Sequence, residues 1–188
     1  MIIEPTKIRD VYICTPKVHK DERGFFMETY RQDDFSQAGI TDIFVQDNHA
    51  RSLVRNTIRG LHFQWQPPFA KIVRVTRGSA FLVAVDIRKN SSTLGRWTGI
   101  EASAENKKQF YIPIGCAFGY QTLTDDCEVQ YKCSAIYNPS GEGEIAWNDT
   151  DIAIDWPIKE SPVLSARSQE AGSLQEWLKN PTSDTFVT

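Results

Sequence analysis

Short runs of β-favouring residues recur along the chain, and clusters of Gly, Pro, Asn and Asp separate them. The clearest runs cover residues 43–46, 58–62, 71–75, 80–87, 109–112 and 128–137. Regularly spaced short strands with turn signals between them are typical of a β-sandwich or β-barrel. The pattern therefore predicts an all-β fold.

Helical periodicity is confined to two stretches. The first covers residues 33–38 and is stopped by Gly39, and the second covers residues 165–179 and ends at Asn180-Pro181. No internal repeat or low-complexity segment interrupts the chain. Because 188 residues suit one unit with a full hydrophobic core, we expect a single domain over residues 1–188 with a few short helices, one of them C-terminal.

Charge and composition narrow the function classes. The net charge is −3, with both signs interspersed, so no nucleic-acid partner is expected. The N-terminus has no basic segment followed by an apolar one, and no apolar run is long enough to cross a bilayer, which predicts a cytoplasmic protein without a membrane partner. The four cysteines form no Cys-x-x-Cys pair, and we interpret them as free thiols.

The candidate chemistry begins with one histidine and one lysine. Strand alternation places Ile58, Gly60, His62 and Gln64 on one face, and Lys71, Val73 and Val75 on one face of the next run. A lysine on an apolar face either meets an anion of the protein or a ligand, or lies at a barrel mouth with its head in water. An isolated strand histidine is commonly structural. Together, however, His62 and Lys71 offer a base and a cation suited to removing a proton beside a carbonyl group.

Two further observations concern an acid and a metal. Alternation through Val129, Tyr131 and Cys133 puts Tyr131 on an apolar face, as a core tyrosine or as a group with a ligand partner. The three histidines lie at no spacing suited to ligating one metal ion. We therefore predict no metal site and no cofactor.

Seven segments, taken in order, resemble the nucleotide-sugar 3,5-epimerases, the dTDP-4-dehydrorhamnose 3,5-epimerase-like enzymes of the cupin fold. The segments are residues 21–28, 46–48, 59–62, 85–88, 92–97, 113–115 and 147–149. The resemblance implies a jelly-roll barrel that forms a homodimer with shared strands. It also implies a metal-free enzyme whose substrate is a nucleoside diphosphate 4-keto-6-deoxyhexose.

The resemblance also implies roles for individual residues. His62 would remove the proton next to the C4 ketone, Lys71 would support the enolate oxygen, and Tyr131 would return a proton from the opposite face. Nucleotide contacts would come from the neighbouring subunit's copies of Arg23, Phe26 and Glu28, and from Gln46, Asn48, Arg59 and Tyr137.

The chain departs from the family pattern at three positions. The family's Leu-Ser-x-Lys-Asp stretch, whose aspartate pairs with the catalytic histidine, reads Leu164-Ser165-Ala166-Arg167-Ser168. Its Ala-His-Gly-Phe stretch reads Ala117-Phe118-Gly119-Tyr120, and Ala50 replaces a frequent serine near the phosphates.

These changes predict a divergent member with an altered pocket. Arg167, Ser168 and Phe118 are expected to border the substrate. Ser168 or Glu170 would hold His62 in place of the aspartate, and loss of that carboxylate should weaken the base.

The altered pocket leaves the activity open in three ways. We favour epimerisation at C3, with inversion at C5 left open, because His62, Lys71 and Tyr131 are all present. A catalytically degenerate paralogue that only binds nucleotide sugars is the first alternative. The second is an isomerase that moves the keto group between C4 and C3 on the same fold.

Overall fold

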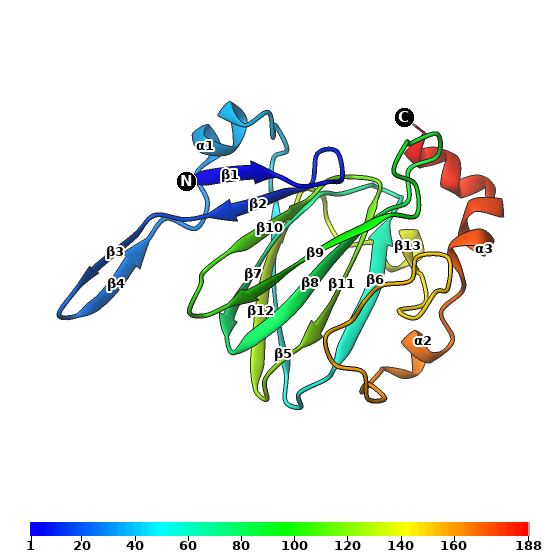
Figure 1. The fold of residues 1–188 in the computed structure, drawn as a ribbon. Coiled ribbons are helices and arrows are strands. Elements are labelled where there is room, and N and C mark those ends of the chain that lie inside the picture. Colours follow the sequence, from blue (N-terminus) through cyan, green and yellow to red (C-terminus); the bar gives the residue numbers. More distant parts are fainter. Residues whose placement is uncertain (188) are drawn as a thin grey trace.

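The computed structural model describes residues 1–187, and its regular structure is dominated by antiparallel strands. The six-stranded sheet contains, in spatial order, β1 (Ile2–Pro5), β2 (Tyr12–Thr15), β10 (Gln109–Ile112), β7 (Lys71–Arg77), β12 (Cys127–Cys133) and β5 (Gln46–Ser52). The five-stranded sheet contains β13 (Glu142–Glu144), β6 (Ile58–Gln64), β11 (Cys116–Thr122), β8 (Ser79–Asp86) and β9 (Trp97–Ser103). The hairpin of β3 (Val18–Asp21) and β4 (Gly24–Met27) projects away from both sheets (Figure 1).

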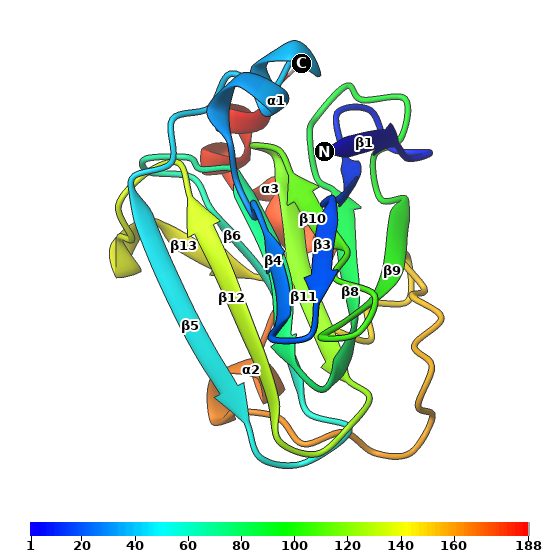
Figure 2. The ribbon, with the colours of Figure 1, turned by 90° about the vertical axis from the view of Figure 1, so that its left-hand side faces the viewer.

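The two sheets face each other and enclose the main core. Its buried side chains come from both sheets, including Val73, Leu82, Phe118 and Val129. The predicted all-β jelly roll is confirmed, but the sheets remain two separate hydrogen-bonded sheets and do not close into one continuous barrel. Figure 2 shows β5 at the edge of the larger sheet beside β12, as their pairing requires.

A second core covers the outer face of the five-stranded sheet. Leu61, Phe63 and Val85 pack there against Trp177 and other side chains of the C-terminal part of the chain. Burial on both faces explains why β11 reads as an uninterrupted buried run. The C-terminal segment therefore covers the outer face of the five-stranded sheet, and the inner face of that sheet packs against the six-stranded sheet.

Strand predictions are correct in place for four runs and wrong in extent for two. Residues 43–45 are not a strand, because the strand begins at Gln46 and continues to Ser52 through Asp47 and Asn48, residues that disfavour strands alone. Pairing with β12 along its whole length stabilises this strand. The last run ends at Cys133, since the chain turns before Pro139.

The predicted common face of Ile58 and His62 is also wrong. The pairing of β6 with β11 shifts register between Phe118 and Tyr120, so that Phe118 lies opposite His62 while Tyr120 lies opposite Arg59. Ile58 packs with Leu61 and Phe63 in the outer core. The shift brings Arg59, not Ile58, to the side of the strand that carries His62.

The first helix agrees with its prediction within one residue, and the second does not. Helix α1 spans Gln32–Gln37. The C-terminal stretch forms two helices, α2 (Ala166–Gln169) and α3 (Leu174–Lys179), because Ser173 starts a new helix through a capping box with Glu176. Short 3₁₀ helices η1 (Pro139–Gly141) and η2 (Pro181–Phe186) complete the chain. Within residues 1–187 no helix has the length and apolar character needed to span a membrane.

Candidate active site

Lys71, the first residue of β7, is buried among aromatic rings. Its side chain is 7% exposed, and Nζ lies 5.1 Å from the ring centre of Phe69, 5.4 Å from that of Phe118 and 5.8 Å from that of Tyr131. No carboxylate of residues 1–187 comes within ion-pair distance of it. Burial lowers the pKa of the Lys71 ammonium, against opposing charges at Cys133 and Glu142. Of the alternatives that the sequence left open for Lys71, an ion pair with a carboxylate is therefore not seen within residues 1–187.

His62 lies on β6 opposite Phe118, so the same ring borders both the histidine and Lys71. Its side chain is 29% exposed, and Nε2 lies 3.3 Å from the carboxylate Oε2 of Glu144. Glu144 belongs to β13 and is the direct register partner of His62. The imidazole thus has one nitrogen facing a carboxylate, which leaves Nδ1 for another contact.

Tyr131 completes the group from β12. The residue packs against the inner core, and Val129 and Cys133 lie on the same face of the strand, as predicted. Burial raises the pKa of the Tyr131 hydroxyl, and the charges of Cys133 and Glu142 act in the same direction. Tyr131 is therefore a protonated phenol beside a lysine, which suits a proton donor.

Polar residues from several elements lie near this group, since Asn48 is the strand partner of Tyr131 and Gln46 that of Cys133. Gln46 Nε2 donates to Asn48 Oδ1 at 3.0 Å, and the Tyr137 amide donates to Gln46 Oε1 at 2.9 Å. The Tyr137 hydroxyl donates to Glu142 Oε2 at 3.0 Å. Hydrogen bonds thus connect Gln46, Asn48, Tyr137 and Glu142 in one chain. The Tyr137 ring stays partly exposed.

Two arginines border the same region. Arg59 Nε donates to the Ser52 hydroxyl at 3.2 Å, and its Nη2 donates to the Arg51 carbonyl at 3.0 Å. Arg167 on α2 pairs with Glu142 at 2.5 Å and with Glu144 at 3.3 Å. Both guanidinium groups offer bidentate donors to an anionic ligand.

The two residues expected to replace the missing aspartate do not occupy equivalent places. Ser168 is buried, its hydroxyl lies 2.8 Å from that of Ser165, and it also borders Glu144. Glu170 is an exposed residue at the C-cap of α2. The carboxylate that reaches His62 is Glu144.

The three residues assigned to a neighbouring subunit lie apart from His62 within this chain. Arg23 and Phe26 belong to the projecting hairpin, where Arg23 pairs with Asp21 and the Phe26 side chain is 68% exposed. Glu28 follows β4 and lies 3.9 Å from Arg31. The chain alone does not bring them to the group around Lys71.

Sequence reasoning missed Glu142 and Glu144. Their strand, Glu142–Glu144, has glycine at its centre, where a Cβ would lie 2.5 Å from the Phe63 ring. The two carboxylates therefore share one face and the glycine takes the other. A Glu-Gly-Glu segment directly after a turn was the available signal, but three residues are too few for periodicity to indicate a strand.

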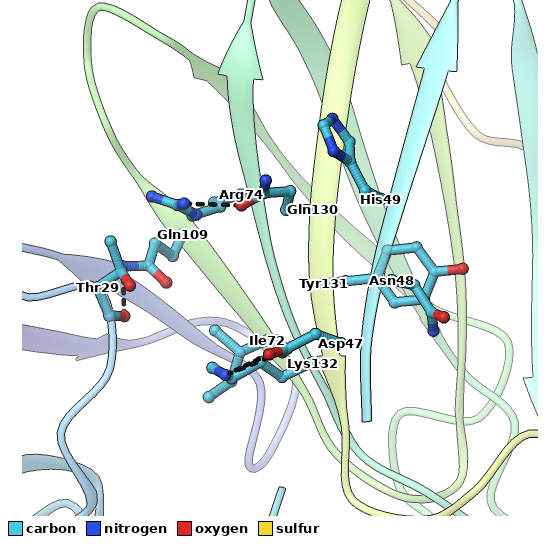
Figure 3. Close-up of a pocket in the computed structure, with 10 residues that line it drawn as sticks. All are labelled: Thr29, Asp47, Asn48, His49, Ile72, Arg74, Gln109, Gln130, Tyr131 and Lys132. Atoms are coloured by element: carbon cyan, nitrogen blue, oxygen red, sulfur yellow. Dashed lines mark hydrogen bonds and ion pairs between the residues drawn. The ribbon is translucent and has the colours of Figure 1, made fainter. Parts of the chain in front are cut away.

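A separate hollow of about 300 Å³ lies behind these strands, on the outer face of the six-stranded sheet. Figure 3 shows Arg74 and Gln130, joined by a 2.7 Å hydrogen bond, on the opposite side of the strands from Tyr131 and Asn48. Tyr131 and Asn48 are among the residues that line the hollow, whereas His62 and Lys71 are not. Across residues 1–187, no three His, Cys, Asp or Glu side chains gather closely enough to hold a metal ion.

Comparison with known proteins connects this arrangement to one family. The family model for dTDP-4-dehydrorhamnose 3,5-epimerase matches residues 5–176. The dTDP-4-dehydrorhamnose 3,5-epimerase of Salmonella typhimurium is 49% identical over 180 residues, covering 95% of this chain and 98% of the relative. The expected divergence is therefore limited to individual positions and does not extend to the whole chain.

Solved structures give the same result. The dTDP-6-deoxy-D-glucose-3,5-epimerase of Legionella pneumophila, in complex with dTDP-4-keto-L-rhamnose, matches with a TM-score of 0.92 and 42% identity, over 97% of this chain and 96% of that one. ChmJ, a 3′-monoepimerase from Streptomyces bikiniensis in complex with dTDP-quinovose, matches with a TM-score of 0.89 and 32% identity, over 98% and 92%. The chain belongs to the dTDP-4-dehydrorhamnose 3,5-epimerase family.

Proposed function

We propose that this protein is a metal-independent epimerase that acts on a dTDP-linked 4-keto-6-deoxyhexose and inverts C3, with C5 as a second centre. The observation that carries the proposal is the buried Lys71 ammonium, which has aromatic rings beside it and no carboxylate of residues 1–187 within ion-pair distance. A buried cation without a partner is costly, and an enolate oxygen would compensate it. The relatives' dTDP-sugar substrates and ligands support the choice of nucleotide.

The residues divide the reaction between them. His62 takes the proton from the carbon beside the C4 ketone, and the electron pair of the broken C–H bond becomes the enolate. Lys71 stabilises the charge on the enolate oxygen, since a carbonyl-adjacent proton is only weakly acidic. Tyr131 then donates a proton to the opposite face of the carbon, which inverts the centre.

Binding of the nucleotide involves the polar residues near this group. Gln46, Asn48 and Arg59 face the diphosphate, Tyr137 offers a stacking surface to the base, and Arg167 reaches the phosphates from α2. Phe118 and Ser168 border the sugar. The whole chain, residues 1–188, acts as one domain in this proposal, and its location is cytoplasmic.

The proposed enzyme is a homodimer in which the β3–β4 hairpin completes the neighbouring site. The exposed aromatic side chains Phe25 and Phe26, on a hairpin that leaves its own sheets, support this assignment (Figure 1). Mixing two inactive variants, His62→Asn and Phe26→Ala, should restore activity if the hairpin serves the partner's site. A mixture as inactive as its components, with subunit exchange verified, would contradict the dimeric site.

Deuterium exchange tests the activity directly. The protein is incubated in D2O with dTDP-4-keto-6-deoxyglucose, and deuterons at C3 and C5 are counted by NMR, with His62→Asn as the control. One deuteron at C3 with inverted product identifies a C3 epimerase, and two identify a 3,5-epimerase. Absence of exchange would support the binding-only alternative, and loss of the C4 ketone would identify the ketoisomerase.

A further inference from the structure

The inference rests on the proposed function and concerns the partner of its base. We propose that Glu144 is the positioning residue for His62, and that its carboxylate takes the place of the one absent at Ser168. Glu144 lies beside His62 because β13 pairs with β6. Ser168, by contrast, belongs to helix α2.

The geometry supports a direct pair. Glu144 is the register partner of His62 across two hydrogen-bonded strands, and its Oε2 lies 3.3 Å from Nε2. The Glu144 side chain is 4% exposed, and a carboxylate buried to this degree needs charged or polar partners. His62 and Arg167 lie within ion-pair distance of Glu144 and Ser168 borders it, although neither carboxylate oxygen accepts a hydrogen bond from residues 1–187 in this structure.

The carboxylate is suited to stay ionised. Desolvation acts to raise the pKa of Glu144, but its polar and charged neighbours His62, Ser168 and Arg167 outweigh it and lower the pKa. A carboxylate that keeps its charge fixes the imidazole tautomer, because Nε2 must then carry the proton and Nδ1 must be the free base.

The C3 proton passes directly from the sugar to His62, and no further reactant is needed. The C3–H bond breaks, its electron pair enters the enolate, and the proton goes to Nδ1 of His62. The resulting imidazolium keeps its Nε2–H directed at Glu144, whose negative charge stabilises it. Glu144 itself gains no proton and touches no substrate atom.

Other charged groups around the pair are few. Arg167 approaches Glu144 from α2, Glu142 is two residues away on β13, and Arg59 lies on the same side of β6 as His62. Lys71 and Tyr131 face the same space from β7 and β12, and among the described residues neither lies within ion-pair distance of Glu144. A substitution at Glu144 therefore removes contacts with His62 and Arg167. The matched substitution at Glu142 removes contacts with Arg167 and Tyr137 and leaves the contact with His62 in place.

The test compares Glu144→Gln with Glu142→Gln. In Glu144→Gln we expect kcat for C3 exchange to fall about 10²-fold, a loss typical of general-base function, while KM changes little. The acidic limb of the kcat profile should move to lower pH. Glu142→Gln should leave that limb in place, with its effect mainly on KM. Adding Ser168→Asp to Glu144→Gln should recover part of the lost rate, because Ser168 borders the same space.

A second measurement needs no substrate. The His62 imidazole is titrated by NMR in the wild type and in Glu144→Gln, with exposed His19 as internal reference, and the midpoint should be lower in the variant, because the neutral amide no longer stabilises the imidazolium. An unchanged midpoint would overturn the assignment of Glu144. Equal kcat losses in both glutamate variants with an unmoved limb would overturn it too. If the wild type shows no exchange while the midpoint moves, the proposed function fails and the His62–Glu144 pair stands.

Discussion

The Lys71 ammonium lies 5.4 Å from the ring centre of Phe118, and Phe118 is the strand neighbour of His62. Phe118 is therefore a neighbour of both the proposed cation and the proposed base. A cation over a ring face recovers part of the cost of burial. An anion that enters the site would offset the remaining cost of burying the ammonium.

Replacing Lys71 should stabilise the protein and abolish its activity. In Lys71→Met a buried charge becomes an apolar side chain of similar length, and we expect a gain of roughly 1–4 kcal/mol in the free energy of unfolding at pH 7. Exchange at C3 should fall by about 10²–10³-fold, as when an oxyanion donor is removed. Chemical denaturation and deuterium exchange measure the two effects. Lys132→Met, at a partly exposed position paired with Asp47, is the control and should change stability by no more than about 0.5 kcal/mol.

The stability gained by Lys71→Met should shrink as pH rises. The folded-state pKa of Lys71 is lowered by burial, so between that pKa and the unfolded value of about 10.4 the unfolded chain binds more protons than the native one. Stability of the wild type then increases with pH in this window. The difference in free energy of unfolding between the wild type and Lys71→Met, measured by denaturation, should therefore be smaller near pH 10 than at pH 7. A difference that stays constant would mean that Lys71 titrates as a solvated lysine.

The alkaline limb of activity should belong to Lys71 and not to Tyr131. Burial lowers the pKa of Lys71 and raises that of Tyr131, so the ammonium loses its proton first. Tyr131→Phe should keep this limb and the exchange at C3, while product inversion falls about 10²-fold. Lys71→Arg should move the limb to higher pH, because guanidinium stays charged. A limb that disappears in Tyr131→Phe would reverse the assignment.

Phe118→His should raise exchange at C5 relative to C3. The new side chain offers a hydrogen-bond donor to the sugar from a position next to His62 and Lys71. One hydrogen bond of about 1 kcal/mol corresponds to roughly a fivefold change in rate. Deuteron counting gives the ratio. Phe118→Leu, which removes the ring without adding a donor, should not raise it, and an equal rise in both variants would assign the effect to pocket size.

Gly60→Ala should destabilise the protein. Gly60 has φ +106°, and an added Cβ would lie 2.5 Å from the Phe118 carbonyl and 2.8 Å from Gly119 Cα. Backbone strain and overpacking each cost about 1–3 kcal/mol, so thermal unfolding should show a loss of at least about 2 kcal/mol. Gly39→Ala, at φ +84° with open space around it, carries the strain alone and should lose less. Similar losses at both positions would show that the close approach of β11 has no effect.

The sequence predicted strands wherever alternation and apolar burial coincide. Lys71, Val73 and Val75 were correctly placed on one face, and so were Val129, Tyr131 and Cys133. Strands that depend on partners were misjudged: Asp47 and Asn48 disfavour a strand locally, and only pairing with β12 stabilises theirs. The register shift opposite Gly60 and the capping box at Ser173 arise from contacts between segments, and periodicity along one segment contains no sign of them.

The site was predictable for residues that a family motif marks, and not for Glu144. Its place beside His62 depends on the register of β13 against β6, which is a property of two segments far apart in the chain. The departure at Ser168 was visible in the sequence, whereas the carboxylate next to it was not. The role assigned to each of these side chains stays a prediction until the variants are measured.

The closeness of Ser168 and Glu144 has a consequence for how such sequences diverge. Because Ser168 borders Glu144, and Glu144 lies 3.3 Å from the His62 imidazole, an acidic group can change its place in the chain with little change of its place in space, and a serine can fill the position it leaves. Sequence columns compared one at a time would then record a lost residue, although the pair of columns preserves the charge. Covariation between these two positions across natural sequences would be the evolutionary trace of that exchange.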